Sequence, residues 1–127
     1  MTTATAPLVL RLPLTIPSQN VRDRQGWRAT HRDMQAWRMF VRAHVRAARV
    51  QLPAPAGLRR VHILSIRRQR ITDRANLVGG CKTAVDALVR EGLLRDDSDA
   101  FARITYAQET LQGRQPQTIV TVYPEGA

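Results

Sequence analysis

The sequence predicts a single α/β (α+β) domain in which helices pack on a mixed four-stranded sheet. Three observations support this fold class. Four stretches have the alternating or β-branched character of strands, two repeat apolar residues at helical spacing, and together they follow the order βαβαββ. A chain of 127 residues is long enough to bury one such core, so we expect residues 1–127 to form one domain.

The first half of the chain contains one expected strand and one expected helix. Residues 8–14, "LVLRLPL", place leucines at every second position, which predicts a strand with one apolar face. Pro13 limits this strand to a sheet edge or marks its end. A polar, basic loop is expected over 15–33, and a helix over 33–49 with Asp33 as its N-cap. The apolar stripe of that helix consists of Met34, Trp37, Val41, Val45 and Ala48.

The second half supplies the remaining elements. A strand is expected over 59–68, and a helix over 76–92 that ends at Gly92. The buried stripe of this helix consists of Leu77, Cys81, Ala84, Val85 and Leu88. Strands over 101–109 and 117–123 flank the polar segment "TLQGRQPQ", which favours an antiparallel hairpin between them.

Two adjacent glycines, Gly79 and Gly80, lie inside the second expected helix. Each costs about 0.5–1 kcal/mol relative to alanine. The pair therefore indicates the close approach of another backbone, a partner subunit or a phosphate. A weak or distorted first turn is the alternative.

The chain is strongly basic, with a net charge of +10 that comes from 19 arginines and one lysine. Such a charge favours a polyanionic partner, most simply nucleic acid, through contacts with phosphates. An arginine-rich composition inherited from a GC-biased genome would produce the same count. No apolar run reaches the length of a membrane span, the start of the chain has no charged segment typical of a secretory signal, and one cysteine excludes an intrachain disulfide. We therefore expect a cytoplasmic protein with no membrane partner.

Acidic residues are concentrated in one part of this basic chain. Residues 73–99 contain six of the ten acids, namely Asp73, Asp86, Glu91, Asp96, Asp97 and Asp99, and also the lone lysine, Lys82. Carboxylates beside an ammonium are typical of metal-dependent phosphodiesterases, in which the metal activates water and stabilises charge on phosphate. A site that uses lysine in a chain so rich in arginine indicates a need for a compact ammonium.

Each of these residues also has a structural interpretation. Asp73 fits a helix cap, Lys82 and Asp86 fit a surface ion pair at i and i+4, and Asp96, Asp97 and Asp99 fit a solvated turn.

Four segments of the chain together form a recognisable set of motifs. Residues 10–20 read "LRLPLTIPSQN", residues 73–77 read "DRANL", residues 81–88 read "CKTAVDAL" and residues 90–99 read "REGLLRDDSD". This pattern resembles the RusA family of Holliday junction resolvases, small dimeric endonucleases of bacteria and prophages. The resemblance covers most of the chain. It implies a RusA-like fold, a Mg²⁺ (or Mn²⁺) cofactor, a homodimer, and branched DNA in the form of four-way junctions as the partner.

The resemblance also implies roles for single residues. Asp73 matches the first aspartate of the family's Asp-x-Asp-Asn element, Lys82 its essential lysine and Asp97 its later metal-binding aspartate, with Asp96 beside it. The catalytic prediction is therefore Asp73, Lys82 and Asp97, and the metal ligands are Asp73, Asp97 and Asp96. The chain departs from the pattern at Ala75, which stands where the element has its second aspartate.

Contacts with DNA are expected from basic residues and from residues able to stack on a base. Trp27, in the predicted basic loop, is a candidate for stacking on an exposed base. The complete set of predicted contacts is Asn20, Trp27, Arg28, Arg38, Arg42, Arg67, Arg68 and Arg70.

These observations favour a Mg²⁺-dependent endonuclease that resolves four-way junctions by paired cuts, and the near two-fold symmetry of a junction favours a homodimer. The departure at Ala75 leaves a non-catalytic, structure-specific DNA-binding dimer as the alternative. An RNA-binding protein is a third possibility, for which the chain shows no recognition motif and few aromatic residues.

Overall fold

Four strands form a mixed sheet in the computed structural model, which describes residues 6–127. The strands are β1 (Leu8–Leu12), β2 (Arg59–Arg67), β3 (Ala102–Thr110) and β4 (Gln117–Val122), and their order across the sheet is β1-β4-β2-β3. β4 pairs antiparallel with β1 and with β2, whereas β2 and β3 are parallel. The expected α+β class with a mixed four-stranded sheet is confirmed. Residues 1–5 of the predicted domain lie outside the described residues.

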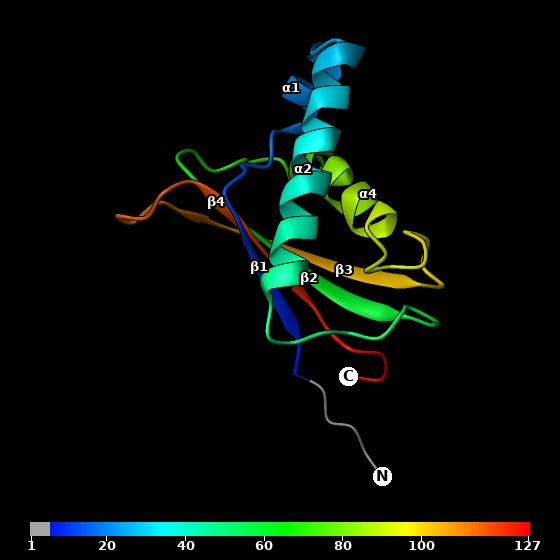
Figure 1. Cartoon of the computed structure of the whole chain (residues 1–127). Coiled ribbons are helices and arrows are strands. Elements are labelled where there is room, and N and C mark those ends of the chain that lie inside the picture. Colours follow the sequence, from blue (N-terminus) through cyan, green and yellow to red (C-terminus); the bar gives the residue numbers. More distant parts are fainter. Residues whose placement is uncertain (1–5) are drawn as a thin grey trace.

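The helical segments of residues 6–127 are α1 (Gln19–Arg24), α2 (Trp27–Ala47), α3 (Arg74–Gly80) and α4 (Lys82–Arg90). Figure 1 shows α2 and α4 lying over the same face of the sheet. None of these helices is both long and apolar enough to cross a membrane.

The core lies between this face of the sheet and the helices. In β1 every second side chain is buried, so that Leu8, Leu10 and Leu12 point into the core as the alternation predicts. The stripe predicted for the helix over 76–92, from Leu77 to Leu88, is buried as well. From α2, Trp37 and Val41 are buried, and Met34 and Val45 pack against the cluster as partly buried residues, as does the C-cap residue Ala48.

The expectations for Pro13 are confirmed. β1 ends at Leu12, directly before the proline, and β1 is an edge strand. Proline cannot donate a hydrogen bond to a ladder, so an edge position and a strand end are the places where it is tolerated.

The predicted hairpin between the last two strands is wrong. β2 lies between β3 and β4, and it pairs with both of them. The reason is visible in the burial of the two strands. β4 alternates half-buried and buried residues as a central strand does, whereas β3 exposes Arg103, Thr105 and Glu109 and suits an edge.

The predicted loop over 15–33 is also wrong in part, because α1 and the first turns of α2 occupy much of it. Ser18 caps α1, and its side chain accepts a hydrogen bond from the Val21 N–H at 3.2 Å. Gly26 is the N-cap of α2, and Asp33 lies inside that helix. The Asp33 carboxylate accepts a hydrogen bond from the Gln25 side chain at 2.9 Å, which ties the connection between the two helices to α2.

The single helix expected over 76–92 is divided into α3 and α4 at Cys81. The Cys81 N–H donates to the Leu77 carbonyl at 3.2 Å and to the Val78 carbonyl at 3.1 Å, so the turn tightens where the glycine pair loosens the helix. At the other end, Gly92 has a φ of +82° and the Leu93 N–H donates to the Leu88 carbonyl, as in a Schellman motif. The predicted C-terminal role of Gly92 is therefore confirmed.

The close approach inferred from Gly79 and Gly80 is confirmed, and the approaching backbone belongs to the same chain. A Cβ atom at position 80 would lie 1.8 Å from the Pro17 carbonyl oxygen, and one at position 79 would lie 2.3 Å from the Gln19 side-chain oxygen. The absence of side chains at both positions lets the segment between β1 and α1 lie directly on α3.

We predict that Gly80→Ala destabilises the protein strongly, because the backbone at Pro17 must move to admit a Cβ atom. Overpacking of this kind typically costs about 1–3 kcal/mol and sometimes more. Urea unfolding followed by circular dichroism measures the loss. Gly57→Ala is the matched control, since a Cβ at that position meets nothing within 4 Å. Equal stabilities of the two variants would contradict the proposed contact.

Candidate functional site

The segment from β2 to α3 carries the predicted catalytic aspartate, and a glutamine from β3 fixes it in place. The Gln108 side-chain oxygen accepts from the Ile71 N–H at 2.9 Å, and its amide nitrogen donates to the Ile71 carbonyl at 2.7 Å. Both backbone groups of Ile71 are thus satisfied by one side chain, much as a neighbouring strand would satisfy them. Gln108 therefore anchors the chain two residues before Asp73.

Asp73 is the N-cap of α3, as one of its two sequence interpretations predicts. Its Oδ1 accepts a hydrogen bond from the Ala75 N–H at 2.8 Å, and the residue is exposed. Ala75 is also exposed and lies in the first turn of the same helix. The cap uses one oxygen of the carboxylate and fixes its orientation. A role as metal ligand stays a prediction.

Lys82 begins α4 and is exposed. No carboxylate of residues 6–127 lies within 4.0 Å of its ammonium, so the ion pair with Asp86 that the spacing allows is not formed. The ammonium is therefore available to an external anion.

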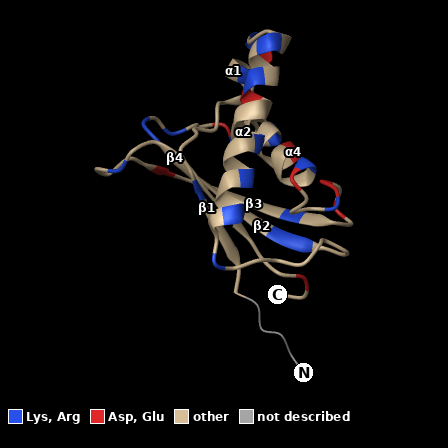
Figure 2. Ribbon diagram, viewed as in Figure 1, with Lys and Arg blue, Asp and Glu red and all other residues tan. Residues whose placement is uncertain are grey.

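Asp96 and Asp97 lie in the loop after α4, near the N-terminal ends of the parallel strands β2 and β3. Asp73, in contrast, follows the C-terminal end of β2. Arg95 holds the loop after α4 in place, because its guanidinium donates to the Ala56 carbonyl at 3.3 Å and lies 5.0 Å from the centre of the Phe101 ring. The Asp73 loop is held at Gln108, six residues farther along β3 than Ala102, which is a separation of about 20 Å at roughly 3.3 Å per residue. In Figure 2 the acidic loop after α4 and the arginine-rich loop after β2 lie on opposite sides of the molecule.

This separation corrects the expectation that the acids gather into one metal site within the chain. All ligands of a magnesium ion lie about 2.1 Å from it, so Asp73 cannot share one ion with Asp96 or Asp97 of the same chain. Among the described residues, no three His, Cys, Asp or Glu side chains are placed to hold a metal ion together. The pKa of Asp96 is lowered, first by a hydrogen bond from the Ser98 side chain and then by the Asp97 backbone, which fits the solvated turn that was the alternative for this segment.

Two of the predicted DNA-binding arginines, Arg38 and Arg42, hold Glu91. The Glu91 carboxylate accepts from Arg38 Nε at 2.7 Å and from Arg42 Nε and Nη2 at 2.7 and 3.1 Å. Its side chain is only 7% exposed, and the hydrogen bond from Arg42 is the largest cause that lowers its pKa. This pair of arginines ties α2 to the end of α4. Their presence is therefore explained without DNA.

Arg67 also has a structural partner, because Nη1 donates to the Ile16 carbonyl and joins the end of β2 to the segment before α1. Burial lowers the pKa of Arg67 from its usual value. Arg68 and Arg70 are exposed in the loop that follows, so their side chains are accessible to a phosphate. Asn20 and Arg28 are exposed as well, on α1 and on the first turn of α2.

The single cysteine is in an environment that makes its thiol unreactive. Cys81 is buried in the core, and burial raises the pKa of its thiol to about 12, although the nearby Arg67 opposes the rise. A thiolate nucleophile is therefore disfavoured at this position.

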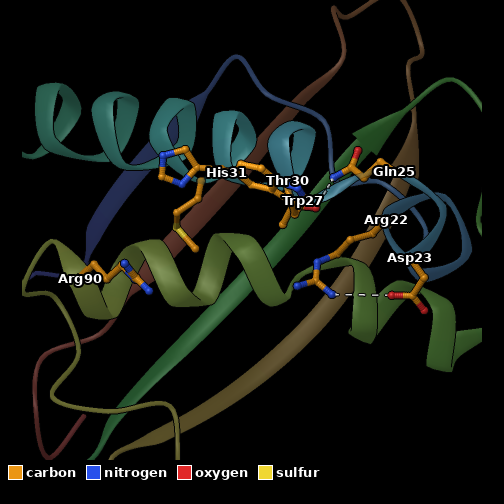
Figure 3. A pocket seen from close by; sticks show the side chains of 8 residues that line it. Arg22, Asp23, Gln25, Trp27, Thr30, His31 and Arg90 are labelled. Atoms are coloured by element: carbon orange, nitrogen blue, oxygen red, sulfur yellow. Dashed lines mark hydrogen bonds and ion pairs between the residues drawn. The ribbon is translucent and has the colours of Figure 1, made fainter.

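A hollow of about 550 Å³ lies between α1, the first turns of α2 and α4 (Figure 3). Arg22 from α1 and Arg90 from α4 line it, together with Trp27 and His31 from α2. Trp27 is at the start of α2 rather than in a loop as predicted, and 73% of its side chain is exposed.

Sequence reasoning missed several residues of this region. Gln108 gave no signal, because a glutamine in a predicted strand looks like any surface residue until its partner is known. Arg90 belongs to the predicted second helix and His31 to the predicted basic loop, and only the fold brings them to one hollow with Arg22.

Comparisons with known proteins add no relative. No protein-family model matches the chain, and neither the curated proteins nor the solved structures gave a significant match. The resemblance to the RusA family therefore stays a prediction that depends on the motifs alone.

We predict that Gln108→Ala loosens the Asp73 loop while leaving the fold intact. The Ile71 amide loses its acceptor, so its hydrogen exchange should become about fivefold faster, because one lost hydrogen bond is worth roughly 1 kcal/mol. Exchange followed by mass spectrometry measures this change over 68–76. Gln115→Ala is the control, since residue 115 is an exposed glutamine beyond β3. If the two variants exchange alike in this segment, Gln108 does not hold the loop.

Proposed function

We propose that this chain is a DNA-binding protein that cuts branched DNA, acting as a Mg²⁺-dependent endonuclease on four-way junctions. One observation carries the proposal. The exposed carboxylate of Asp73 lies in a short segment that also presents the exposed arginines Arg68, Arg70 and Arg74. Arg70 and Arg74 line one small hollow there, of about 150 Å³. A polyanion attracted to these cations is brought beside a carboxylate.

The donor set fits magnesium of the kind that nucleases use. Mg²⁺ keeps several water molecules and is commonly bound by one or two carboxylates and by phosphate oxygens of the substrate. Asp73 supplies one exposed carboxylate, oriented by its bond to Ala75. When bound, the ion would lower the pKa of a water molecule and stabilise negative charge on the phosphate. Lys82 would add a compact positive charge to the phosphate, since it has no carboxylate partner in the described chain.

The homodimer proposed for two symmetric cuts offers a place for Asp97. Asp73 and Asp97 of one chain lie at opposite ends of the β2–β3 pair, but a two-fold axis can bring Asp97 of a second copy to Asp73 of the first. We therefore propose that each metal site is completed by both chains. Two such composite sites arise from one dimer.

The second candidate function is a structure-specific DNA-binding dimer without catalysis. Ala75 favours it, because this exposed position beside Asp73 adds no second carboxylate. Binding without metal is expected in both cases, so cleavage is the measurement that separates them.

We predict that the protein nicks a synthetic four-way junction in Mg²⁺ or Mn²⁺ and leaves a linear duplex intact. Asp73→Asn and Lys82→Arg should each lose at least about a hundredfold in rate while junction binding is kept, because the charge-stabilising groups act on the transition state. Arg49→Ala, a change at an exposed arginine beyond α2, is the control for general loss of charge. Junction binding without cleavage under any divalent metal would favour the non-catalytic dimer, and equal binding of duplex and junction would refute structure specificity.

We predict that mixing two inactive variants restores nicking. Asp73→Asn and Asp97→Asn subunits, exchanged into heterodimers, should form one site with both aspartates and one site with neither. The mixture should therefore nick one strand of the junction, although each variant alone is inactive. If the mixture stays inactive after subunit exchange, which native mass spectrometry verifies, the shared site is wrong. Full activity of Asp97→Asn alone would show that Asp97 is no ligand.

A further inference from the structure

The hollow between α1, α2 and α4 combines an exposed aromatic surface with two cations. Trp27 presents its ring at the rim, and the Arg28 guanidinium lies 5.1 Å from the ring centre. Among the exposed large apolar residues of the described chain, Trp27 has the largest exposed fraction, at 73%. Figure 3 shows Arg90 at the C-terminal end of α4, whereas Arg22 comes from α1 and lies near the N-terminal end of α4.

One residue that lines the hollow, Arg22, is hydrogen-bonded to the neighbour of the candidate catalytic lysine. Arg22 Nε donates to the Thr83 hydroxyl at 3.3 Å, and Thr83 follows Lys82 in the first turn of α4. Arg22 also lies 3.9 Å from the Asp23 carboxylate, which is itself exposed. With Arg22 and Arg90 against Asp23, the lining carries a net positive charge.

We propose that this hollow binds one unpaired nucleotide of the DNA, with the base stacked on Trp27 and a flanking phosphate paired with Arg90 or Arg22. The inference rests on the proposed function, because it assumes a DNA partner, and it adds the structural feature that is recognised. Pockets for ligands of this size typically have volumes of about 300–1,000 Å³, and the hollow lies within that range.

The chemistry of the lining favours this occupant over the alternatives. A stacking ring with cations nearby is the arrangement that single-stranded nucleic acid recognition uses, since every base has a flat face and every nucleotide a phosphate. A double helix would present its phosphates to the hollow but not a free base. An acidic peptide would use the arginines and leave the ring of Trp27 without a specific role.

The test uses a short single-stranded oligonucleotide of thymidines with one central 2-aminopurine, whose fluorescence falls when it stacks on an aromatic ring. Titration with the full-length protein should quench the probe. Trp27→Ala should abolish the quenching and weaken binding about tenfold, whereas Trp27→Phe should retain much of both, because stacking on a base contributes roughly a factor of ten in affinity. Met39→Ala, which removes another exposed apolar side chain of α2, is the control.

Two matched arginine variants test whether the cations of the hollow contribute to binding. Arg90→Ala and Arg46→Ala each remove one charge from an exposed arginine of a helix, and only Arg90 lines the hollow. We expect Arg90→Ala to weaken binding of the oligonucleotide several-fold more than Arg46→Ala. Equal losses in the two arginine variants, or unchanged quenching in Trp27→Ala, would overturn the proposal.

Failure of the inference and failure of the proposed function give different results. If the natural protein binds both the oligonucleotide and a four-way junction, but Trp27→Ala quenches the probe equally well, the hollow is not a nucleotide site. DNA binding by the protein is then unaffected. If it binds neither DNA at low salt, the proposed function fails and the inference fails with it.

Discussion

The half of the molecule that contains the candidate site depends on the close contact between Gly80 and the Pro17 carbonyl. A single Cβ atom at position 80 would overlap that oxygen, so the contact exists only because the position is glycine. It sets the segment after β1 directly on α3, which in turn places α1 beside α3 and α4. The helix is interrupted at Cys81, directly after the glycine pair, so that α4 begins at Lys82. One constraint on backbone distance thus places the lysine, the aspartate cap and the hollow beside α1.

Some arginines of this protein bond to groups within the protein, and others are exposed without such a partner. Only the second group is fully available to attract an external anion. Arg59 is 1% exposed and donates to the carbonyls of Leu93 and Pro53, with Glu125 3.4 Å from its Nε. Arg38 and Arg42 serve in the same structural way around Glu91. The planar guanidinium of Arg59 bonds to two carbonyls at once, which offsets part of the cost of burying its charge, although its Nε has no hydrogen-bond partner. The net charge of the sequence therefore overstates the number of cations available to a phosphate backbone.

Much of the fold follows from local patterns in the sequence, while strand order and the arrangement of the acids do not. The alternation in residues 8–12 and 117–122 and the apolar stripe on α4 are local, and they predict strands, helix and buried faces correctly. Strand order depends on which strand is better suited to an edge, and the polar side chains of β3 became informative only once its neighbours were known. The resemblance placed Asp73 and Asp97 in one site, but the βαβ connection carries the chain from one end of the parallel pair to the other. Spacing along the sequence cannot show this separation, because it depends on the direction of two strands.

Lys82 is the only lysine of the chain, and it is exposed at the start of α4. Its uniqueness has a practical chemical consequence. Arginine side chains do not react with acylating reagents at neutral pH because they remain protonated, so the ε-amine of Lys82 is the one side-chain amine open to acetylation or to an amine-directed label. A cell that acetylates this protein at a side chain would neutralise one charge out of twenty. The charge that is lost would be the one that we assign to the proposed DNA-cutting site.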